Sequence, residues 1–147
     1  MRRLMTRKFD WLLGAAFLAA PFYWWVLTLF VNSTSEPAES SADTKRLLLL
    51  VIVYPILEEI VFRGALQGWV RRKSWGLRHR FGVTTANILT SIVFAAFHLI
   101  RRPNIWSAGV ILPGLVFGFF RDRYGNLYAP MALHIFYNAG LICLFRV

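Results

Sequence analysis

The stretch Leu47–Trp69, LLLLVIVYPILEEIVFRGALQGW, decides how this chain folds. It is longer than the ~20 apolar residues that an α-helix needs to cross a bilayer, yet its middle carries Glu58 and Glu59 and, one helical turn later, Arg63. A charged side chain at the centre of a membrane helix costs about 2.5–3.5 kcal/mol on insertion scales. Such side chains face other helices or a water-filled cavity, so the stretch predicts a polar site inside a helical bundle.

The composition of the whole chain is that of a polytopic membrane protein. Of its 147 residues, 57% are hydrophobic, the net charge is +10 and the mean hydropathy is +0.51. The basic residues stand in short loops between apolar runs, which indicates a topology signal and contact with anionic lipid head groups rather than nucleic-acid binding. The single cysteine, Cys143, excludes an intrachain disulfide and a cysteine-rich metal cluster.

The apolar runs predict an all-α transmembrane bundle that forms a single domain over residues 1–147. Five membrane helices are expected, at about Trp11–Val31, Leu47–Val70, Val83–Ile100, Ile105–Phe120 and Leu127–Phe145. The first is too long for the apolar part of a signal peptide and is expected to stay in the membrane. Pro113-Gly114 predicts a kink or break in the fourth, and the polar segment Asn32–Arg46 is expected to be solvated and mobile.

The distribution of Lys and Arg predicts the orientation. Eleven of them lie in the N-terminal tail, the second loop and the fourth loop, and five lie on the other side of a five-helix arrangement. Positive loops stay cytoplasmic. The N-terminus is therefore predicted to be cytoplasmic and the C-terminus outside.

A short set of polar residues interrupts the apolar segments: Glu58, Glu59, Arg63, Asn87, His98, His134 and Asn138. Glu59 and Arg63 are four residues apart, as are His134 and Asn138, so each pair shares one helix face. Glu58 points about 100° away from Glu59 and can face a different neighbour. Asn87 is better explained as an interhelical hydrogen bond. Convergence of the remaining faces would place helices two, three and five around one pocket.

Such a pocket favours water-activating hydrolysis. A covalent mechanism is poorly supported, because Cys143 lies off the face of His134 and Ser91 lies two turns before His98. A carboxylate and a histidine can together activate water, and a second histidine with an amide can donate hydrogen bonds to a developing oxyanion.

Three motifs carry a resemblance to a known family. Glu58-Glu59-Ile-Val-Phe-Arg63 resembles the EExxxR motif of the CAAX-processing and bacteriocin-processing (CPBP) intramembrane glutamic endopeptidases. Phe94-Ala-Ala-Phe-His98 resembles the FxxxH motif of that family, and His134-Ile-Phe-Tyr-Asn138 its HxxxN motif. The resemblance covers about Leu47–Leu144 in the order of the family, and implies a short bacterial member close to the minimal catalytic core.

The resemblance implies roles for the polar residues. Glu58 would be the general base, assisted by His98, although two adjacent carboxylates can exchange roles. His134 and Asn138 would form the oxyanion site, and Glu59 with Arg63 would be an orienting pair. The implied reaction uses a catalytic water without a cofactor. The implied substrate is a membrane-anchored protein or peptide, and the implied location is the bacterial inner membrane.

Two alternatives remain open at this level. Glu58, His98 and His134 could instead be the three protein ligands of a catalytic zinc, or the chain could be a non-catalytic membrane scaffold or immunity protein. The predicted positions of three site residues along their helices also conflict with a shared pocket. Glu58 falls at mid-membrane, whereas His98 falls near the outer end of its helix and His134 near the inner end. Their convergence requires shifted helix boundaries, tilted helices, or a third helix that continues past Arg101.

Overall fold

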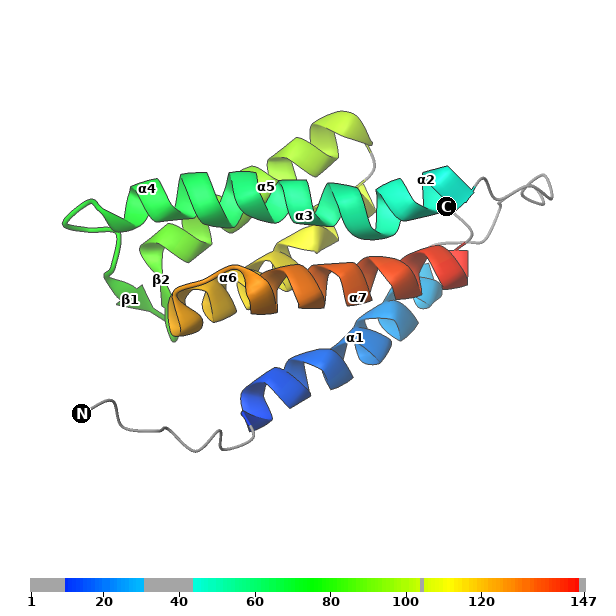
Figure 1. The fold of residues 1–147 in the computed structure, drawn as a ribbon, viewed down its shortest axis with the longest axis horizontal. Coiled ribbons are helices and arrows are strands. Elements are labelled where there is room, and N and C mark those ends of the chain that lie inside the picture. Colours follow the sequence, from blue (N-terminus) through cyan, green and yellow to red (C-terminus); the bar gives the residue numbers. More distant parts are fainter. Residues whose placement is uncertain (1–9, 31–43, 104, 146–147) are drawn as a thin grey trace.

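The structure is a computed structural model that describes residues 10–30, 44–103 and 105–145, and these residues are helical apart from short connections and one small β-hairpin (Figure 1). The expected all-α class is therefore confirmed for the described residues. Most of the segment Asn32–Arg46, predicted to be mobile, lies outside them; its last residues, from Thr44, begin a helix.

Each predicted apolar run contains a helix. The helical elements are α1 (Trp11–Phe30), α2 (Thr44–Leu48), η1 (Leu49–Val53), α3 (Tyr54–Glu59), η2 (Ile60–Leu66), α4 (Gln67–Arg71), α5 (Thr85–Arg101), η3 (Ile105–Val110), α6 (Ile111–Tyr124) and α7 (Tyr128–Phe145). Those from α2 to α4 follow one another without a break and form one continuous helix, residues 44–71, which we call the long helix. It begins three residues before its predicted start.

Two π-helical segments, η1 and η2, widen the long helix on either side of the glutamates. Pro55 has no N–H and would clash in a regular α-helix. The preceding η1 has i→i+5 bonding instead, and the Tyr54 N–H donates to the carbonyl of Leu49. The second segment holds Arg63 and ends where the Gln67 N–H donates to the carbonyl of Phe62. The widened turns therefore lie next to the charged side chains.

The hairpin links the long helix to α5. Strand β1 (His79–Arg80) pairs antiparallel with β2 (Val83–Thr84). Phe81 and Gly82 form the two-residue turn with φ of 52° and 82°, the positive values that a tight hairpin turn requires. Thr84 then caps α5, because its hydroxyl accepts a hydrogen bond from the Asn87 N–H at 3.0 Å.

The fourth apolar run does change helix type, but before Pro113 rather than at it. The 3-10 helix η3 gives way to α6 at Ile111. Pro113 thus lies in the first turn of α6, where a missing N–H costs little.

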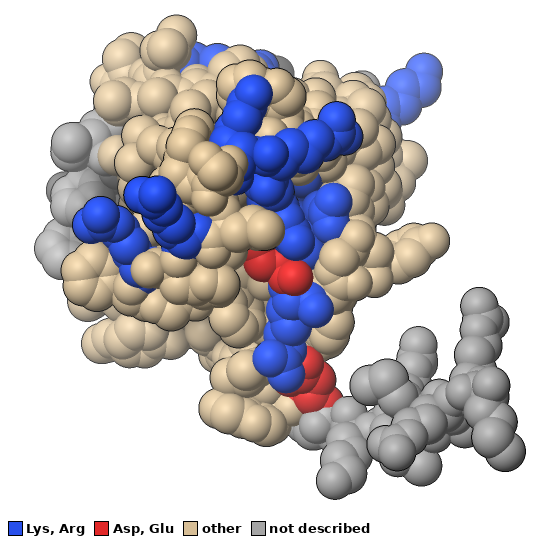
Figure 2. Space-filling view, turned by 90° about the vertical axis from the view of Figure 1, so that its left-hand side faces the viewer, with Lys and Arg blue, Asp and Glu red and all other residues tan. Residues whose placement is uncertain are grey.

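The helices run alternately from one end of the molecule to the other (Figure 1). Helix α5 packs on α6, α6 on α7, and α7 on both α1 and the long helix. The C-terminus of the long helix, the hairpin and the C-terminus of α6 meet at one end, which we call the basic end. Figure 2 looks onto it and shows Lys and Arg side chains gathered across it.

Large apolar side chains are exposed on the outside of the helices; examples are Leu18 at 78%, Phe22 at 65% and Leu112 at 60%. By length and composition, Trp11–Leu29 is the one described helix that could cross a membrane, and Thr85–Arg101 and Tyr128–Leu144 are shorter apolar helices. The predicted number of five membrane helices therefore stays a prediction.

Candidate active site

The long helix, α5 and α7 bring five of the six predicted site residues together. Glu58 and Glu59 lie near the middle of the long helix, His98 near the C-terminus of α5, and His134 in α7. Helix α5 crosses the long helix obliquely (Figure 1), and this tilt carries His98 to the level of Glu58. Helix tilt therefore brings together Glu58, His98 and His134, which the linear sequence placed at different levels along their helices.

His134 lies between the two glutamates. Its Nδ1 is 3.0 Å from Oε1 of Glu59, and its Nε2 is 3.6 Å from Oε2 of Glu58. The ring stacks on Phe117, with 5.0 Å between the ring centroids, and meets the edge of Phe94. Two aromatic rings therefore fix the imidazole in the plane that points its nitrogens at the carboxylates.

Glu58 is the more accessible of the two glutamates. Its side chain is 18% exposed, and its Oε2 lies 3.9 Å from Nε2 of His98. Nδ1 of His98 is 3.0 Å from the carbonyl of Phe94. Since a carbonyl can only accept, Nδ1 carries the hydrogen, and a neutral His98 presents the Nε2 lone pair toward Glu58.

Glu59 and Arg63 form a fully buried ion pair. Nε of Arg63 stands 3.5 Å from Oε2 of Glu59, and both side chains are 0% exposed. Nη2 of Arg63 donates to the carbonyl of Gly114 at 3.0 Å, and the Phe94 ring covers the guanidinium at 5.1 Å. The fold depends on both members of this buried pair, because removing either one leaves the other charge buried without compensation.

Asn138, the sixth predicted residue, is turned away from the glutamates. Its Nδ2 donates to the carbonyl of Leu50 at 3.2 Å, two turns before Glu58 on the long helix. It shares a helix face with His134 as predicted, but here it ties α7 to the long helix. One of its two amide hydrogens remains for another acceptor.

A line of polar contacts extends from Glu59 to the basic end, and sequence reasoning did not identify most of it. This polar column consists of Glu59, Arg63, Gln67 and Arg71 on the long helix, facing Gly114, Gly118 and Asp122 on α6. Gln67 donates to the carbonyl of Gly118 at 3.0 Å and to Asp122 at 2.9 Å. The four-residue repeat of polar residues along the long helix was the signal that could have revealed it.

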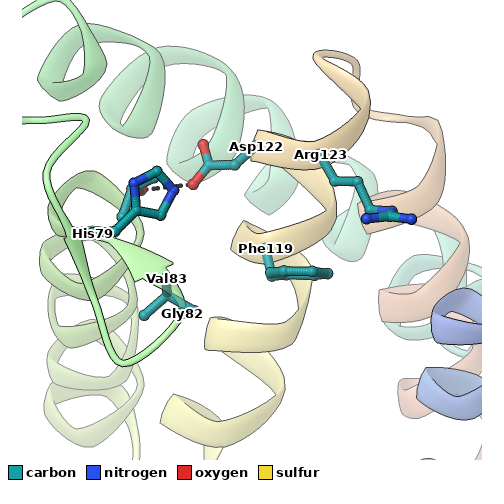
Figure 3. A pocket seen from close by; sticks show the side chains of 7 residues that line it. His79, Gly82, Val83, Phe119, Asp122 and Arg123 are labelled. Carbon is teal, nitrogen blue, oxygen red and sulfur yellow. Dashed lines mark hydrogen bonds between the residues drawn. The ribbon is translucent and has the colours of Figure 1, made fainter.

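Asp122 closes the polar column at the basic end. Besides Gln67, its carboxylate accepts hydrogen bonds from Arg71 and from Thr84, each at 2.6 Å. Asp122 and Thr84 also line a hollow of about 210 Å³ with His79, Gly82, Val83, Phe119 and Arg123 (Figure 3). The hollow lies at the basic end and not at the glutamates.

Helices α5 and α6 pack closely beside this column at Gly114 and Gly118. A Cβ on Gly118 would overlap the side chain of Asn87. Asn87 itself donates to the carbonyl of Leu115 at 2.9 Å and accepts from Ser91. The prediction that Asn87 makes an interhelical hydrogen bond is confirmed.

The alternative chemistries gain no new support from the described residues. Cys143 is exposed, and the hydroxyl of Ser91 donates to the side-chain amide of Asn87 at 3.1 Å. Within residues 10–30, 44–103 and 105–145, no group of three or more His, Cys, Asp and Glu side chains is arranged to hold a metal ion.

Comparisons with known proteins match the part of the chain that carries the site. The model of the Rce1-like family, described as type II CAAX prenyl endopeptidase Rce1-like, matches residues 40–140. The uncharacterized protein YpbD of Bacillus subtilis (strain 168) is 28% identical over 109 residues, which are 73% of this chain and 49% of that protein. The chain thus spans about half the length of this relative, and no solved structure matches it. The resemblance carried by the three motifs is confirmed: the chain belongs to the Rce1-like family of CAAX prenyl endopeptidases.

Proposed function

We propose that the protein is an intramembrane endopeptidase in which Glu58 activates a water molecule for attack on a peptide bond. The observation that carries this proposal is the difference between the two adjacent glutamates. Glu59 is fully buried and held by Arg63 and His134, whereas Glu58 is 18% exposed and lies between two imidazoles. A general base must reach a water and a substrate, and Glu58 has that access.

His98 assists the base in this proposal. Its Nε2 lone pair and the Glu58 carboxylate face each other across 3.9 Å, a gap too wide for a direct hydrogen bond. A single water molecule can donate to both groups from beside that gap. Attack on the scissile carbonyl would then transfer a proton from the water to Glu58, which can pass it to the leaving amine.

His134 supplies the oxyanion contact. When both ring nitrogens carry hydrogens, Nδ1 donates to Glu59 and Nε2 is free to donate to a substrate oxygen next to Glu58. Asn138 was expected to share this task. It can do so with its second amide hydrogen, or after its bond to Leu50 is exchanged for one to the substrate.

The proposed substrate is the tail of a membrane-anchored protein or peptide. Membrane association of the family, the exposed apolar side chains and the buried charges support a membrane location, which we propose is the bacterial inner membrane. The basic end would lie at the cytoplasmic surface, where anionic lipids favour Lys and Arg. Cysteines introduced at Ser40 and Ser74 test this orientation: an impermeant thiol reagent added to intact cells should label the first and not the second, and the reverse pattern contradicts it.

The decisive experiment replaces each glutamate by glutamine. Glu58→Gln keeps the side-chain shape but removes the base, so turnover should fall ~10²–10⁴-fold while the fold is retained. Cleavage of a prenylated CAAX peptide by purified protein, and the termini of membrane proteins in cells with and without the gene, are the readouts. Asp10→Asn provides a matched carboxylate-to-amide control outside the site and should leave turnover nearly unchanged.

The same assay separates the alternatives. A peptidase with a glutamate-activated water should keep its activity in strong chelators. Stoichiometric zinc whose removal abolishes turnover and whose return restores it would favour the zinc hydrolase. Full activity of well-folded Glu58→Gln and Glu59→Gln proteins, or no effect of gene loss on any membrane-protein terminus, would favour the scaffold.

A further inference from the structure

Five buried side-chain atoms next to the polar column make no hydrogen bond within the described part of the chain. They are Oε2 of Glu59, Nε and Nη1 of Arg63, Oε1 of Gln67 and Oγ1 of Thr90. The four side chains are 0% exposed. Oε2 of Glu59 and Nε of Arg63 face each other at 3.5 Å as an ion pair, so the atoms without any partner among the described residues are Nη1 of Arg63, Oε1 of Gln67 and Oγ1 of Thr90. Native proteins rarely leave several unpaired buried polar groups together.

Arg63, in η2, and Gln67, in α4, belong to the part of the long helix that packs against α5, the helix that carries Thr90. The α6 side of the column is satisfied, because Arg63 and Gln67 bond the carbonyls of Gly114 and Gly118. A Cβ on Gly114 would meet Phe94, and one on Gly118 would meet Asn87. Phe94 of α5 therefore lies opposite Gly114 of α6, and Asn87 lies opposite Gly118. Thr90 lies between Asn87 and Phe94 in α5, so its hydroxyl is level with the interval between Arg63 and Gln67.

The unpaired set contains both donors and acceptors. Nη1 of Arg63 donates, Oε1 of Gln67 accepts, and the Thr90 hydroxyl does both; Oε2 of Glu59, at 3.5 Å from Nε of Arg63, can accept a further hydrogen bond. The Phe94 ring over the guanidinium attracts the cation but offers nothing to the two acceptor oxygens. Among small species, water suits a mixed set of this kind, since it donates and accepts at once.

We propose that buried water molecules occupy the interface between the long helix and α5 and form a path from Gln67 to Glu59. Successive polar residues of the long helix are four apart, a rise of about 6 Å, which two hydrogen bonds through one water can span. Gln67 also bonds Asp122, which lines the hollow at the basic end (Figure 3). The path therefore ends at a carboxylate that reaches the surface.

The path gives an intramembrane hydrolase a source of water. Each turnover consumes one water molecule, and a site surrounded by lipid has to receive it from a surface. This supply role rests on the proposed function, whereas the presence of the waters does not. The two statements can be tested separately.

Hydroxyl-radical labelling of the full-length protein in lipid nanodiscs tests for the waters. A short X-ray pulse produces radicals from bound as well as bulk water, and these oxidise adjacent side chains. Phe94 is 2% exposed and covers Arg63, and Phe120 is equally buried, at 2%, in the apolar core. Phe94 should be labelled several-fold more than Phe120; equal labelling of the two would overturn the proposal.

Variants connect the label to the path. Thr90→Val keeps the shape of the side chain and Gln67→Leu approximates it, and each should lower Phe94 labelling several-fold without changing that of Phe120. Both should also lower kcat with little change in KM. Glu58→Gln should lower turnover by the ~10²–10⁴-fold stated above and keep the Phe94 label, so failure of the peptidase proposal and failure of the water path give different results. Undiminished Phe94 labelling in a folded Thr90→Val protein would show that no water is held at that hydroxyl.

Discussion

Helix α7 joins two halves of the bundle that are held together by different interactions. On one side it packs against α1 through an apolar core made of Ala16, Ala20, Phe117, Phe120, Leu133 and Tyr137. On the other side it meets the long helix through His134 and its carboxylate partners. The family match covers the polar half and stops short of α1.

The apolar half relies on close contact of many weak partners. A Cβ on Gly140 would overlap the ring of Trp24, whose Nε1 donates to the carbonyl of Tyr137 at 3.1 Å. The Tyr137 hydroxyl in turn donates to the carbonyl of Ala16 at 3.0 Å. Dispersion forces of this kind are individually small and add up over the interface, so the loss of one contact removes only part of what holds the interface together.

The polar half relies on a few strong partners that depend on one another. Arg63 serves Glu59, Gly114 and Phe94 at once, and Glu59 also holds His134. Both side chains of the Glu59–Arg63 pair are 0% exposed, so no bulk water replaces a lost partner there. The comparison teaches that the polar half is specified by a few interdependent polar contacts and the α1 half by shape.

The largest effect is expected from Arg63→Ala. It leaves the Glu59 carboxylate buried beside an empty volume, and breaking a buried ion pair costs about 3–5 kcal/mol. We expect loss of monodisperse protein in detergent, and hence of activity. Melting of the purified protein, followed by its helical signal, is the measurement.

Two companions sharpen this prediction. The double variant Glu59→Gln with Arg63→Met removes both charges and should recover folding without recovering turnover. Leu133→Ala, at a site that is 0% exposed in the apolar half, should lower the melting temperature by less. Equal stability losses for Arg63→Ala and Leu133→Ala would remove the distinction between the two halves.

The two closely packed glycines give an intermediate effect. Gly118→Ala pushes the Asn87 side chain from its bonds to Leu115 and Ser91, and Gly140→Ala pushes Trp24. Overpacking costs typically ~1–3 kcal/mol at each site. Because Gly118 belongs to the polar column, its variant should lose a larger share of turnover than the Gly140 variant at a similar melting temperature. Equal turnover at equal stability would contradict this expectation.

The sequence predicted the helices well because the chain alternates long apolar runs with short charged connections. It also predicted that Glu59 would pair with Arg63, since a four-residue spacing fixes neighbours within one helix. It did not predict the π-helical segments around Pro55 and Arg63. Pro55 marks a place where regular α-helical bonding is interrupted, but its presence does not specify that the chain answers with a π-helical turn.

Sequence analysis missed Gln67 and Asp122 because the residues around them are typical of helix ends and loops. Gln67 looks like a polar residue near a helix end, and Asp122 lies in the charged run Arg121-Asp122-Arg123, which reads as a loop at the membrane surface. Their partnership joins residues 55 positions apart in the chain. For Asn138 the helix face was predicted but its partner was not. Its bond to Leu50 depends on how α7 is placed along the long helix.

The smallest effect concerns the anchor that holds α1 to the rest. Asp10 accepts hydrogen bonds from the Tyr124 hydroxyl at 2.5 Å, from Arg123 at 2.8 Å and from the Leu12 N–H at 3.1 Å. These contacts, chiefly that with Tyr124 and then that with Arg123, lower the pKa of Asp10 below its usual 3.8. A carboxyl whose pKa is lower in the folded state stabilises the fold above its unfolded pKa, and this stabilisation is lost as the pH falls through the folded pKa.

Asp10→Asn should therefore lower the melting temperature slightly at neutral pH, and the difference from wild type should shrink once the pH drops below about 3.8. The pair with Arg123 is partly exposed, at 42% for the arginine, so salt should reduce the effect as well. Melting curves of both proteins across this pH range, at low and high salt, provide the measurement. Tyr124→Phe is the matched control, because it removes the largest cause of the shift and leaves the charges in place. A difference between Asp10→Asn and wild type that is the same in acid as at neutral pH would mean that Asp10 acts as an uncharged helix cap, and that α1 is held by its apolar face alone.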